Sequence, residues 1–160
     1  FMISERDKKF LERAIALSRK GMSGGKGGPF GCVVVQGDEI VGEGCNEVTS
    51  SNDPTAHAEV VAIRNACNKL NRFQLNDCEI FTSCEPCPMC LGAIYWARPK
   101  RVVYANTKDD AAAIDFDDDF IYTEIATPMS DRKIPFIHEP HPEAKKVFED
   151  WKHWEGKTKY

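Results

Sequence analysis

The organisation of this chain follows from two short stretches of sequence, HAE at residues 57–59 and CEPCPMC at residues 84–90. They contain one imidazole, that of His57, and the thiols of Cys87 and Cys90. One histidine and two cysteines give a zinc ion three protein ligands and leave the fourth tetrahedral position for water. Zinc lowers the pKa of such a water toward ~7, so that a nucleophile forms at neutral pH. The two stretches therefore predict a catalytic zinc site.

Glu59 follows the histidine by two residues and can perform the proton transfer that this chemistry needs. Its carboxyl group can take a proton from the water and pass it to a ring nitrogen and to the departing amine. A purely structural zinc site has no use for such a carboxylate. Glu59 is therefore the predicted catalytic residue.

The cysteine spacing leaves one alternative open. Cys84, Cys87 and Cys90 follow the pattern C-x-x-C-x-x-C, so that Cys84 is a candidate for the fourth ligand of a closed site with His57. Water would then be excluded from the metal. The chain would in that case be a non-catalytic structural zinc protein.

The composition narrows the class of protein further. A chain of 160 residues suits one domain with a packed core. Its formal net charge is −4 and no cluster of Lys and Arg stands out, which argues against a nucleic-acid partner and is compatible with a small neutral substrate. The seven cysteines are an odd number that includes two zinc ligands, so we expect the reducing cytoplasm. No apolar run approaches the ~18 residues of a membrane span, and no secretory hydrophobic region is found.

The first part of the chain alternates between helical and strand patterns. Ser4 and Asp7 are a predicted N-cap pair for an amphipathic helix that ends near Gly21, and the glycine-rich residues 21–28 read as a flexible connector. The predicted strands are Phe30–Gln36, Glu39–Asn46, Asp77–Ser83 and Arg101–Ala105. Strands separated by helices predict an α/β domain with a mixed, partly parallel sheet.

The zinc ligands are expected at the starts of two helices. Thr55 is the predicted N-cap of the first, which places His57 and Glu59 in its first turn. The second begins at the prolines of the CEPCPMC stretch, so that Cys87 and Cys90 lie three residues apart on one face. Thiols at a helix N-terminus lose their protons more readily.

The sequence changes character after the fourth predicted strand, and we divide the chain into a zinc-binding core, 1–105, and a C-terminal arm, 106–160. Residues 115–120 mix aspartate with phenylalanine and are typical of a solvated loop or of a helix N-terminus. Ile134–Ile137 contains a proline and is at most an edge strand. Glu143–Trp154 has the apolar spacing of an amphipathic helix.

The chain resembles the guanine deaminases of the cytidine-deaminase-like superfamily, of the bacterial zinc type. The pattern H-x-E followed by P-C-x-x-C is the signature of zinc nucleobase deaminases in general. The resemblance to the guanine-specific family is carried by the stretches GPFG (28–31), SNDPTAHAE (51–59), TSCEPCPMCLGAIYWA (82–97), FDD (116–118) and FIY (120–122) and by Tyr160.

This resemblance implies a three-layer cytidine-deaminase-like fold, with a central mixed sheet flanked by helices and a C-terminal helical arm that completes the active site. It implies one zinc ion per subunit and the hydrolytic deamination of guanine to xanthine and ammonia. The resemblance further implies a homodimer in which the arm crosses to the other subunit. The sequence leaves open which subunit's pocket the arm of this chain completes.

The resemblance also implies roles for individual residues. His57, Cys87 and Cys90 would bind zinc, with Glu59 as the proton carrier. The residues implied to bind the purine, by stacking, by hydrogen bonds or by closing the pocket, are Phe30, Asn46, Ala58, Asp118 and Tyr160. From its spacing alone, Asn46 would be read as a residue that stabilises a turn.

Asp118 is expected to distinguish guanine from adenine. Guanine presents its N1–H and its exocyclic amine side by side as donors, and an ionised carboxylate offers only acceptors. Adenine has no donor at N1. Asp117 is the nearest competitor for this role, because both belong to the same acidic run.

The nearest competing functions are deamination of adenosine in tRNA, of another purine, or of a nucleoside such as guanosine. An enzyme for tRNA should have a basic surface, whereas this chain is acidic overall and its arm carries a run of aspartates that repels phosphate. A nucleoside enzyme needs groups that bind ribose, and the sequence leaves this alternative open.

Overall fold

The structure, a computed structural model, describes residues 2–160 and divides the chain into two compact units. The first unit ends at Asp119 and the second is Phe120–Tyr160. This boundary lies later than the one placed at 105/106, so the first unit includes the FDD stretch. That the arm completes the active site stays a prediction.

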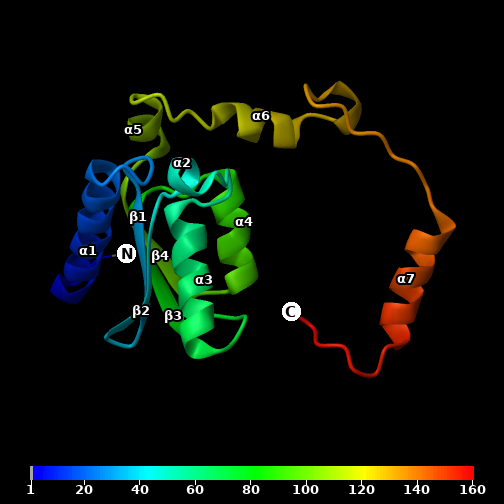
Figure 1. The fold of residues 1–160 in the computed structure, drawn as a ribbon, viewed down its shortest axis with the longest axis horizontal. Helices are drawn as coiled ribbons and strands as arrows, with labels where there is room; N and C mark the ends of the chain where they lie inside the picture. Colours follow the sequence, from blue (N-terminus) through cyan, green and yellow to red (C-terminus); the bar gives the residue numbers. More distant parts are fainter. Residues whose placement is uncertain (1) are drawn as a thin grey trace. The chain divides into compact units, whose positions relative to one another are not determined.

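The first unit is built on a sheet of four strands with the order β2-β1-β3-β4 (Figure 1). Its strands are β1 (Gly31–Gln36), β2 (Glu39–Cys45), β3 (Cys78–Cys84) and β4 (Arg101–Asn106). β1 pairs antiparallel with both β2 and β3, and β3 pairs parallel with β4. The predicted mixed sheet is thereby confirmed, with strand boundaries close to those expected. Gly37, in the turn between β1 and β2, has a φ of 61°, which glycine tolerates without strain.

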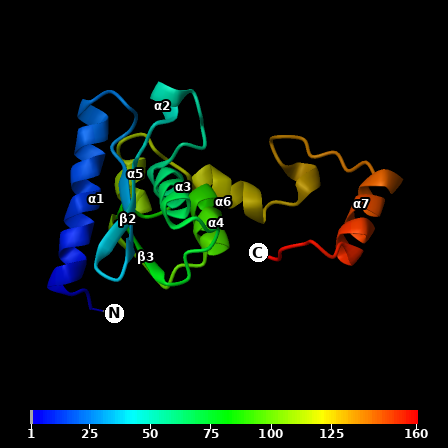
Figure 2. The same ribbon diagram turned by 60° about the horizontal axis from the view of Figure 1, so that its bottom comes forward.

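Helices cover both faces of this sheet (Figures 1 and 2). Helix α1 (Glu5–Ser23) packs on one face, and α3 (Ala58–Leu70) and α4 (Pro88–Ala97) pack on the other. Successive side chains of β1 point to opposite faces of the sheet and so contribute to both core layers. Val33 and Val35 face α1, whereas Cys32 and Val34 face the other two helices. This is the three-layer arrangement that was predicted.

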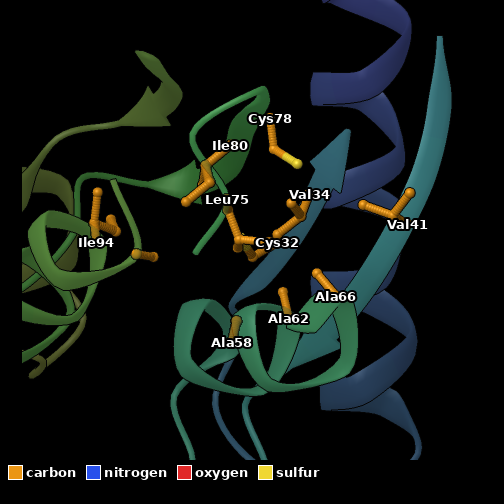
Figure 3. Packing of buried hydrophobic residues seen from close by; sticks show 11 residues of the cluster. Cys32, Val34, Val41, Ala58, Ala62, Ala66, Leu75, Cys78, Ile80 and Ile94 are labelled. Carbon is orange, nitrogen blue, oxygen red and sulfur yellow. The ribbon is translucent and has the colours of Figure 1, made fainter. Parts of the chain in front are cut away.

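Small residues bring α3 close to the sheet. Ala58, Ala62 and Ala66 lie on one side of the helix and are fully buried (Figure 3). A Cβ on Gly44 would lie 2.4 Å from the carbonyl oxygen of Ala58, and one on Gly42 would lie 2.4 Å from that of Ala62. Neither glycine of β2 therefore tolerates a side chain without moving α3. The N-terminus of α3, where the predicted site residues begin, is held at a fixed height above the sheet.

The predicted cap of α1 is confirmed. The Ser4 hydroxyl accepts a hydrogen bond from the Asp7 backbone N–H at 3.1 Å, and the Asp7 carboxylate accepts one from the Ser4 N–H at 3.3 Å. Asp7 also accepts a hydrogen bond from Arg101 of β4 at 2.7 Å, although it is 3% exposed. The cap therefore also ties α1 to the far edge of the sheet.

The prediction that Thr55 caps the next helix is wrong. Both the backbone N–H and the hydroxyl of Thr55 donate to the Asp53 carboxylate, at 2.8 and 2.7 Å, so Thr55 belongs to a turn. His57 is the N-cap of α3 instead. A short helix, α2 (Val48–Ser51), lies between Asn46 and this turn.

After β4, one short helix was not predicted, and a second begins within residues 115–120, where a helix N-terminus was one of the two alternatives. In the first unit, α5 (Lys108–Ala112) is capped by Thr107, whose hydroxyl accepts from the Asp110 N–H at 3.3 Å. Helix α6 (Asp119–Ala126) begins at the boundary between the units, and a short 3₁₀ turn, η1 (Met129–Asp131), follows it.

The second unit confirms one prediction and removes another. Helix α7 (Pro142–His153) lies close to the predicted bounds. No strand forms at Ile134–Ile137, because the described residues place strands only in the sheet of the first unit. A search of residues 2–160 finds no helix with the length and apolar content that crossing a membrane requires.

Candidate zinc site and active site

The predicted ligands lie at the starts of two neighbouring helices (Figure 1). His57 is the N-cap of α3 and Cys87 is the N-cap of α4, and both have extended backbone angles. Neither side chain caps its own helix, so each is available to a ligand. Cys90 follows as the third residue of α4 and is fully buried. The positive ends of both helix dipoles favour negative charge here.

The three donor atoms fit a zinc ion. The Nδ1 atom of His57 lies 3.5 Å from the Sγ atom of Cys87 and 3.5 Å from that of Cys90. All three atoms lie within 4.8 Å of one another. Tetrahedral zinc with ordinary Zn–N and Zn–S bond lengths separates nitrogen from sulfur by about 3.6 Å. The side chains therefore already stand at coordination distances.

The two sulfur atoms and the imidazole are electrostatically coupled. A hydrogen bond from Cys90, followed by one from His57, lowers the pKa of the Cys87 thiol to about 4. The interaction with Cys87 is in turn the largest cause that raises the pKa of the Cys90 thiol. The hydrogen bond with Cys87 also raises the pKa of His57. The site thus stabilises a thiolate, which is the form of cysteine that binds metal.

Cys84 does not belong to this group. It is the last residue of β3, and its thiol donates to the carbonyl oxygen of Thr107 at 3.6 Å. Burial raises its pKa to about 11, so it stays a thiol. Within residues 2–160 the ligand group consists of His57, Cys87 and Cys90 alone. The alternative of a closed site with Cys84 as the fourth ligand is therefore wrong.

Glu59 is buried beside the ligands. One carboxylate oxygen, Oε2, accepts a hydrogen bond from the Cys90 thiol at 3.4 Å. The other, Oε1, lies 3.4 Å from the hydroxyl of Thr82, a buried residue of β3. Burial raises the pKa of Glu59, which brings it closer to the range in which a carboxyl group both takes and returns protons. Its position and environment suit the predicted role.

Asn46 is buried where β2 ends and connects two loops. Its Oδ1 atom accepts hydrogen bonds from the backbone N–H groups of Gly28, at 3.3 Å, and Val48, at 3.1 Å. A Cβ on Gly27 would lie 2.3 Å from the same oxygen. Asn46 thus stabilises a turn, as its spacing predicted, and it does so through its side-chain oxygen. The contact of its amide nitrogen with the purine stays a prediction.

The GPFG stretch lies against the FDD stretch. The rings of Phe30 and Phe116 meet edge to face, with centroids 5.0 Å apart. A Cβ on Gly28 would lie 2.9 Å from Phe116 and 3.2 Å from Phe30. The reading of residues 21–28 as merely a flexible connector missed this close packing. Phe116 was not among the predicted site residues, although its place in the FDD stretch, beside Asp118, could have indicated it.

Asp118 differs from the other acids of its run in its burial. It is half-buried, whereas Asp115, Asp117 and Asp119 are exposed. Burial, followed by the nearby charge of Cys87, raises the pKa of its carboxyl group. The Asp117 carboxylate instead accepts a local hydrogen bond from the Asp119 N–H at 2.9 Å. Geometry therefore favours Asp118 over its neighbours.

Two predicted residues of the purine site remain. Ala58, the first residue of α3, is fully buried against β2, and its part in binding the purine stays a prediction. Tyr160 belongs to the second unit and is 70% exposed there. Its part in closing the pocket stays a prediction.

Comparisons with known proteins agree with this site. Residues 4–106 match the family model described as the cytidine and deoxycytidylate deaminase zinc-binding region. The chain is 55% identical to the guanine deaminase of Bacillus subtilis over 151 residues, which are 94% of this chain and 97% of the relative. An X-ray structure of guanine deaminase from Bacillus subtilis superposes with a TM-score of 0.94 at 52% identity, covering 99% of each chain.

A second relative is more distant. The chain is 38% identical to the tRNA-specific adenosine deaminase of Haemophilus influenzae over 112 residues, which are 69% of this chain and 64% of the relative. That similarity covers less of the chain than the similarity to the guanine deaminase does.

Proposed function

Because this chain belongs to the family of the cytidine and deoxycytidylate deaminase zinc-binding region, we propose that it is a zinc-dependent aminohydrolase that converts guanine to xanthine and ammonia. One observation carries the choice of guanine. The similarity to a guanine deaminase extends over 94% of the chain and so reaches beyond the matched zinc-binding region, which ends at residue 106. The residues proposed to select the base lie partly in this later segment.

The proposed chemistry divides between the metal and one carboxyl group. His57, Cys87 and Cys90 hold the zinc ion, which when bound supplies a nucleophile at neutral pH by lowering the pKa of a water toward ~7. Glu59 takes up a proton on its buried carboxylate. It delivers this first proton to a ring nitrogen, takes a second one from the hydroxyl that has been added to the ring carbon, and passes the second to the amine, which leaves as ammonia. Its raised pKa makes the protonated form accessible for both transfers.

The proposed binding of the base uses groups around the ligands. Phe30 and Phe116 provide an aromatic surface for the purine ring, and the amide nitrogen of Asn46 donates to the ring edge. The Asp118 carboxylate accepts from N1–H and from the exocyclic amine of guanine. Tyr160 closes the pocket from the arm. Adenine offers no donor at N1 and would leave Asp118 unsatisfied.

Two competing substrates deserve a direct test. The relative that acts on tRNA adenosine shares the zinc-binding region, so adenosine in tRNA is a candidate. The net charge of −4 and the acidic run at residues 115–119 disfavour it, because tRNA binding requires neutralised phosphates. Guanosine differs from guanine only by its ribose and is the closer competitor.

We also propose a homodimer in the cytoplasm. Exposed apolar side chains lie on α4, where Tyr95 is 75% exposed, and on α7, where Phe148 is 79% exposed. Such side chains are typical of subunit interfaces. Exchange of the arm between subunits is the proposed arrangement, with an arm that stays on its own subunit as the alternative. All seven cysteines are free, which supports a reducing compartment.

The deciding experiment measures ammonia release from guanine, guanosine, adenine, adenosine and cytidine by the zinc-loaded protein. We expect turnover of guanine with at most weak activity on the others. Removal of zinc by a chelator should abolish the activity, and added zinc should restore it. Guanosine or adenosine as the best substrate would overturn the assignment to guanine.

A further inference from the structure

Glu85 joins the loop of the zinc ligands to the segment that follows β4. Its backbone N–H donates to the carbonyl oxygen of Asn106 at 2.8 Å. Its side-chain Oε2 accepts from the backbone N–H of Lys108, also at 2.8 Å. Next to it, Cys84 pairs with Asn106 across the sheet and donates its thiol to Thr107. Residues 84–85 are thus bound to residues 106–108 by consecutive contacts.

The bonded segment leads directly to the residues proposed to bind the base. Lys108 is the first residue of α5, and the backbone N–H of Phe116 donates to the carbonyl oxygen of Ala111 in the same helix at 3.0 Å. The FDD stretch is therefore attached to the end of α5, just as Glu85 is attached to its start. All of these residues belong to the first unit.

We propose that Glu85 is a positioning residue that sets where Asp118 stands relative to the zinc ligands. The inference rests on the proposed function and deepens it. Glu85 lies two residues before Cys87, so a shift of α5 against the ligand loop would move Asp118 away from the reacting carbon. The distance of 2.8 Å between the Lys108 backbone nitrogen and the Glu85 oxygen is that of a well-formed hydrogen bond, which can hold α5 against the ligand loop.

The length of the side chain is the property that matters in this proposal. Glu85→Gln keeps an acceptor oxygen at the same reach and loses only the charge. Glu85→Asp keeps the charge but withdraws the oxygen from Lys108. If Glu85 served only to place a negative charge at the start of α5, Asp would replace it better than Gln. If it positions α5 by its hydrogen bond, Gln would replace it better than Asp.

The test compares Glu85→Gln, Glu85→Asp and Glu85→Ala in the full-length zinc-loaded protein. We expect Glu85→Asp and Glu85→Ala to lower kcat/KM for guanine about tenfold with unchanged zinc content, as for the loss of one hydrogen bond. Glu85→Gln should stay within about twofold of the parent. Hydrogen exchange of the amides at 107–118 should quicken in the first two variants and stay slow in the third.

Two further comparisons separate positioning from stability. In an Asp118→Ala background, Glu85→Ala should lower kcat/KM for guanine little further, because the carboxylate that Glu85 positions is already absent. Asp110→Ala removes the carboxylate that accepts from the Thr107 backbone N–H at 2.9 Å and leaves Glu85 in place, so it is the matched control and should keep kcat/KM within about twofold.

Specific outcomes would overturn the inference. One is a higher kcat/KM for Glu85→Asp than for Glu85→Gln. A second is an equal loss of kcat/KM on Glu85→Ala in the parent and in the Asp118→Ala background. A third is unchanged hydrogen exchange in Glu85→Ala. A parent protein that does not turn over guanine would refute the proposed function instead, and the hydrogen-exchange comparison would still decide whether Glu85 holds α5. If Glu85→Ala fails to fold, the comparison of kcat/KM between Glu85→Gln and Glu85→Asp decides.

Discussion

The ring of Phe30 meets the ring of Phe116 edge to face, with centroids 5.0 Å apart and planes at 87° to each other. Phe30 lies just before β1, and Phe116 lies beyond β4 in the run that carries Asp118. The pair therefore joins the start of the first strand to the segment that follows α5. Edge-to-face pairs contribute ~0.5–1.5 kcal/mol beyond the area they bury.

Gly28→Ala should disturb this pair. The new methyl group would lie 2.9 Å from Phe116, whose exposed ring can move away. Because the proposed aromatic surface is then incomplete, we expect KM for guanine to rise roughly 2–12-fold, the equivalent of one aromatic pair. Steady-state kinetics measures the change. Phe116→Leu should show a similar rise, and unchanged KM values in both variants would contradict a role of the pair in binding.

Glu59→Gln should retain fold and zinc but lose most activity. The amide is nearly isosteric with the carboxyl group but cannot accept and return a proton, and general acid–base catalysis is worth ~10²–10⁴-fold. Turnover and zinc content of the purified variant are the measurements. Glu143→Gln changes a first-turn glutamate of α7 in the same way and is the control for a mere effect on a helix dipole. Near-parental turnover of Glu59→Gln would remove it from the mechanism.

Asp118→Ala should lower kcat/KM for guanine by roughly 10–200-fold, since a hydrogen bond to a charged group contributes ~1.5–3 kcal/mol. Zinc content should not change, because the carboxylate is outside the ligand group. Asp119→Ala, which alters an exposed acid of the same run, is the control and should have a much smaller effect. Full activity of Asp118→Ala would show that the base is selected elsewhere.

Phe148→Glu should weaken the proposed dimer. Phe148 is exposed on α7, so a charge there costs little within one chain but is unfavourable in an apolar interface. We expect the dissociation constant of the dimer to rise at least about tenfold, measured by sedimentation. Lys146→Glu, also exposed on α7, is the matched control. A protein that is monomeric before substitution, or a truncation after Asn106 that stays fully active, would refute the dimer with a functional arm.

Asp7→Asn should destabilise the first unit in a pH-dependent way. Hydrogen bonds to Arg101, followed by the Ser4 backbone, hold the pKa of Asp7 below its ordinary value despite its burial. A pKa lowered by folding adds stability that is complete above the unfolded pKa of ~3.9 and is lost as the pH falls through the folded pKa. We therefore expect a loss of ~1.5–3 kcal/mol at pH 7 that shrinks below pH ~4.

Unfolding in urea across this pH range measures the effect. Asp38→Asn is the control, because Asp38 also pairs with Arg6 but its side chain is 88% exposed. Its loss should be at most ~1 kcal/mol. An equal loss for Asp7→Asn at pH 3 and pH 7 would show that packing, and not charge, makes Asp7 important.

The sequence alone was enough to locate the zinc ligands and to predict a mixed sheet between helices. His57, Cys87 and Cys90 were recognisable because the metal demands particular residue types, and those residues lie in two short stretches. The strands were recognisable because alternation and β-branched residues act locally. The cap of α1 at Ser4 was predicted for the same reason.

The spacing C-x-x-C-x-x-C was compatible with an open or a closed metal site, and only the tertiary structure decided between them. Cys84 ends β3 as the partner of Asn106, and this pairing turns its thiol toward Thr107 and away from His57. A thiol's direction depends on where its strand ends and on what lies opposite, and residues nearby in sequence do not determine either. The sequence also did not show that His57 and not Thr55 is the N-cap of α3, because Thr55 donates to Asp53 within a turn.

The choice among the aspartates of residues 115–119 also required the fold. Consecutive acids look equivalent in sequence, but only Asp118 is half-buried near Cys87. The segment that carries it makes contacts across long separations, namely Phe116 against Phe30 and the start of α5 against Glu85. Chemistry that depends on residue type can be predicted from the chain alone. Which of several like residues performs it is decided by burial and by distant contacts, which exist only once the chain has folded.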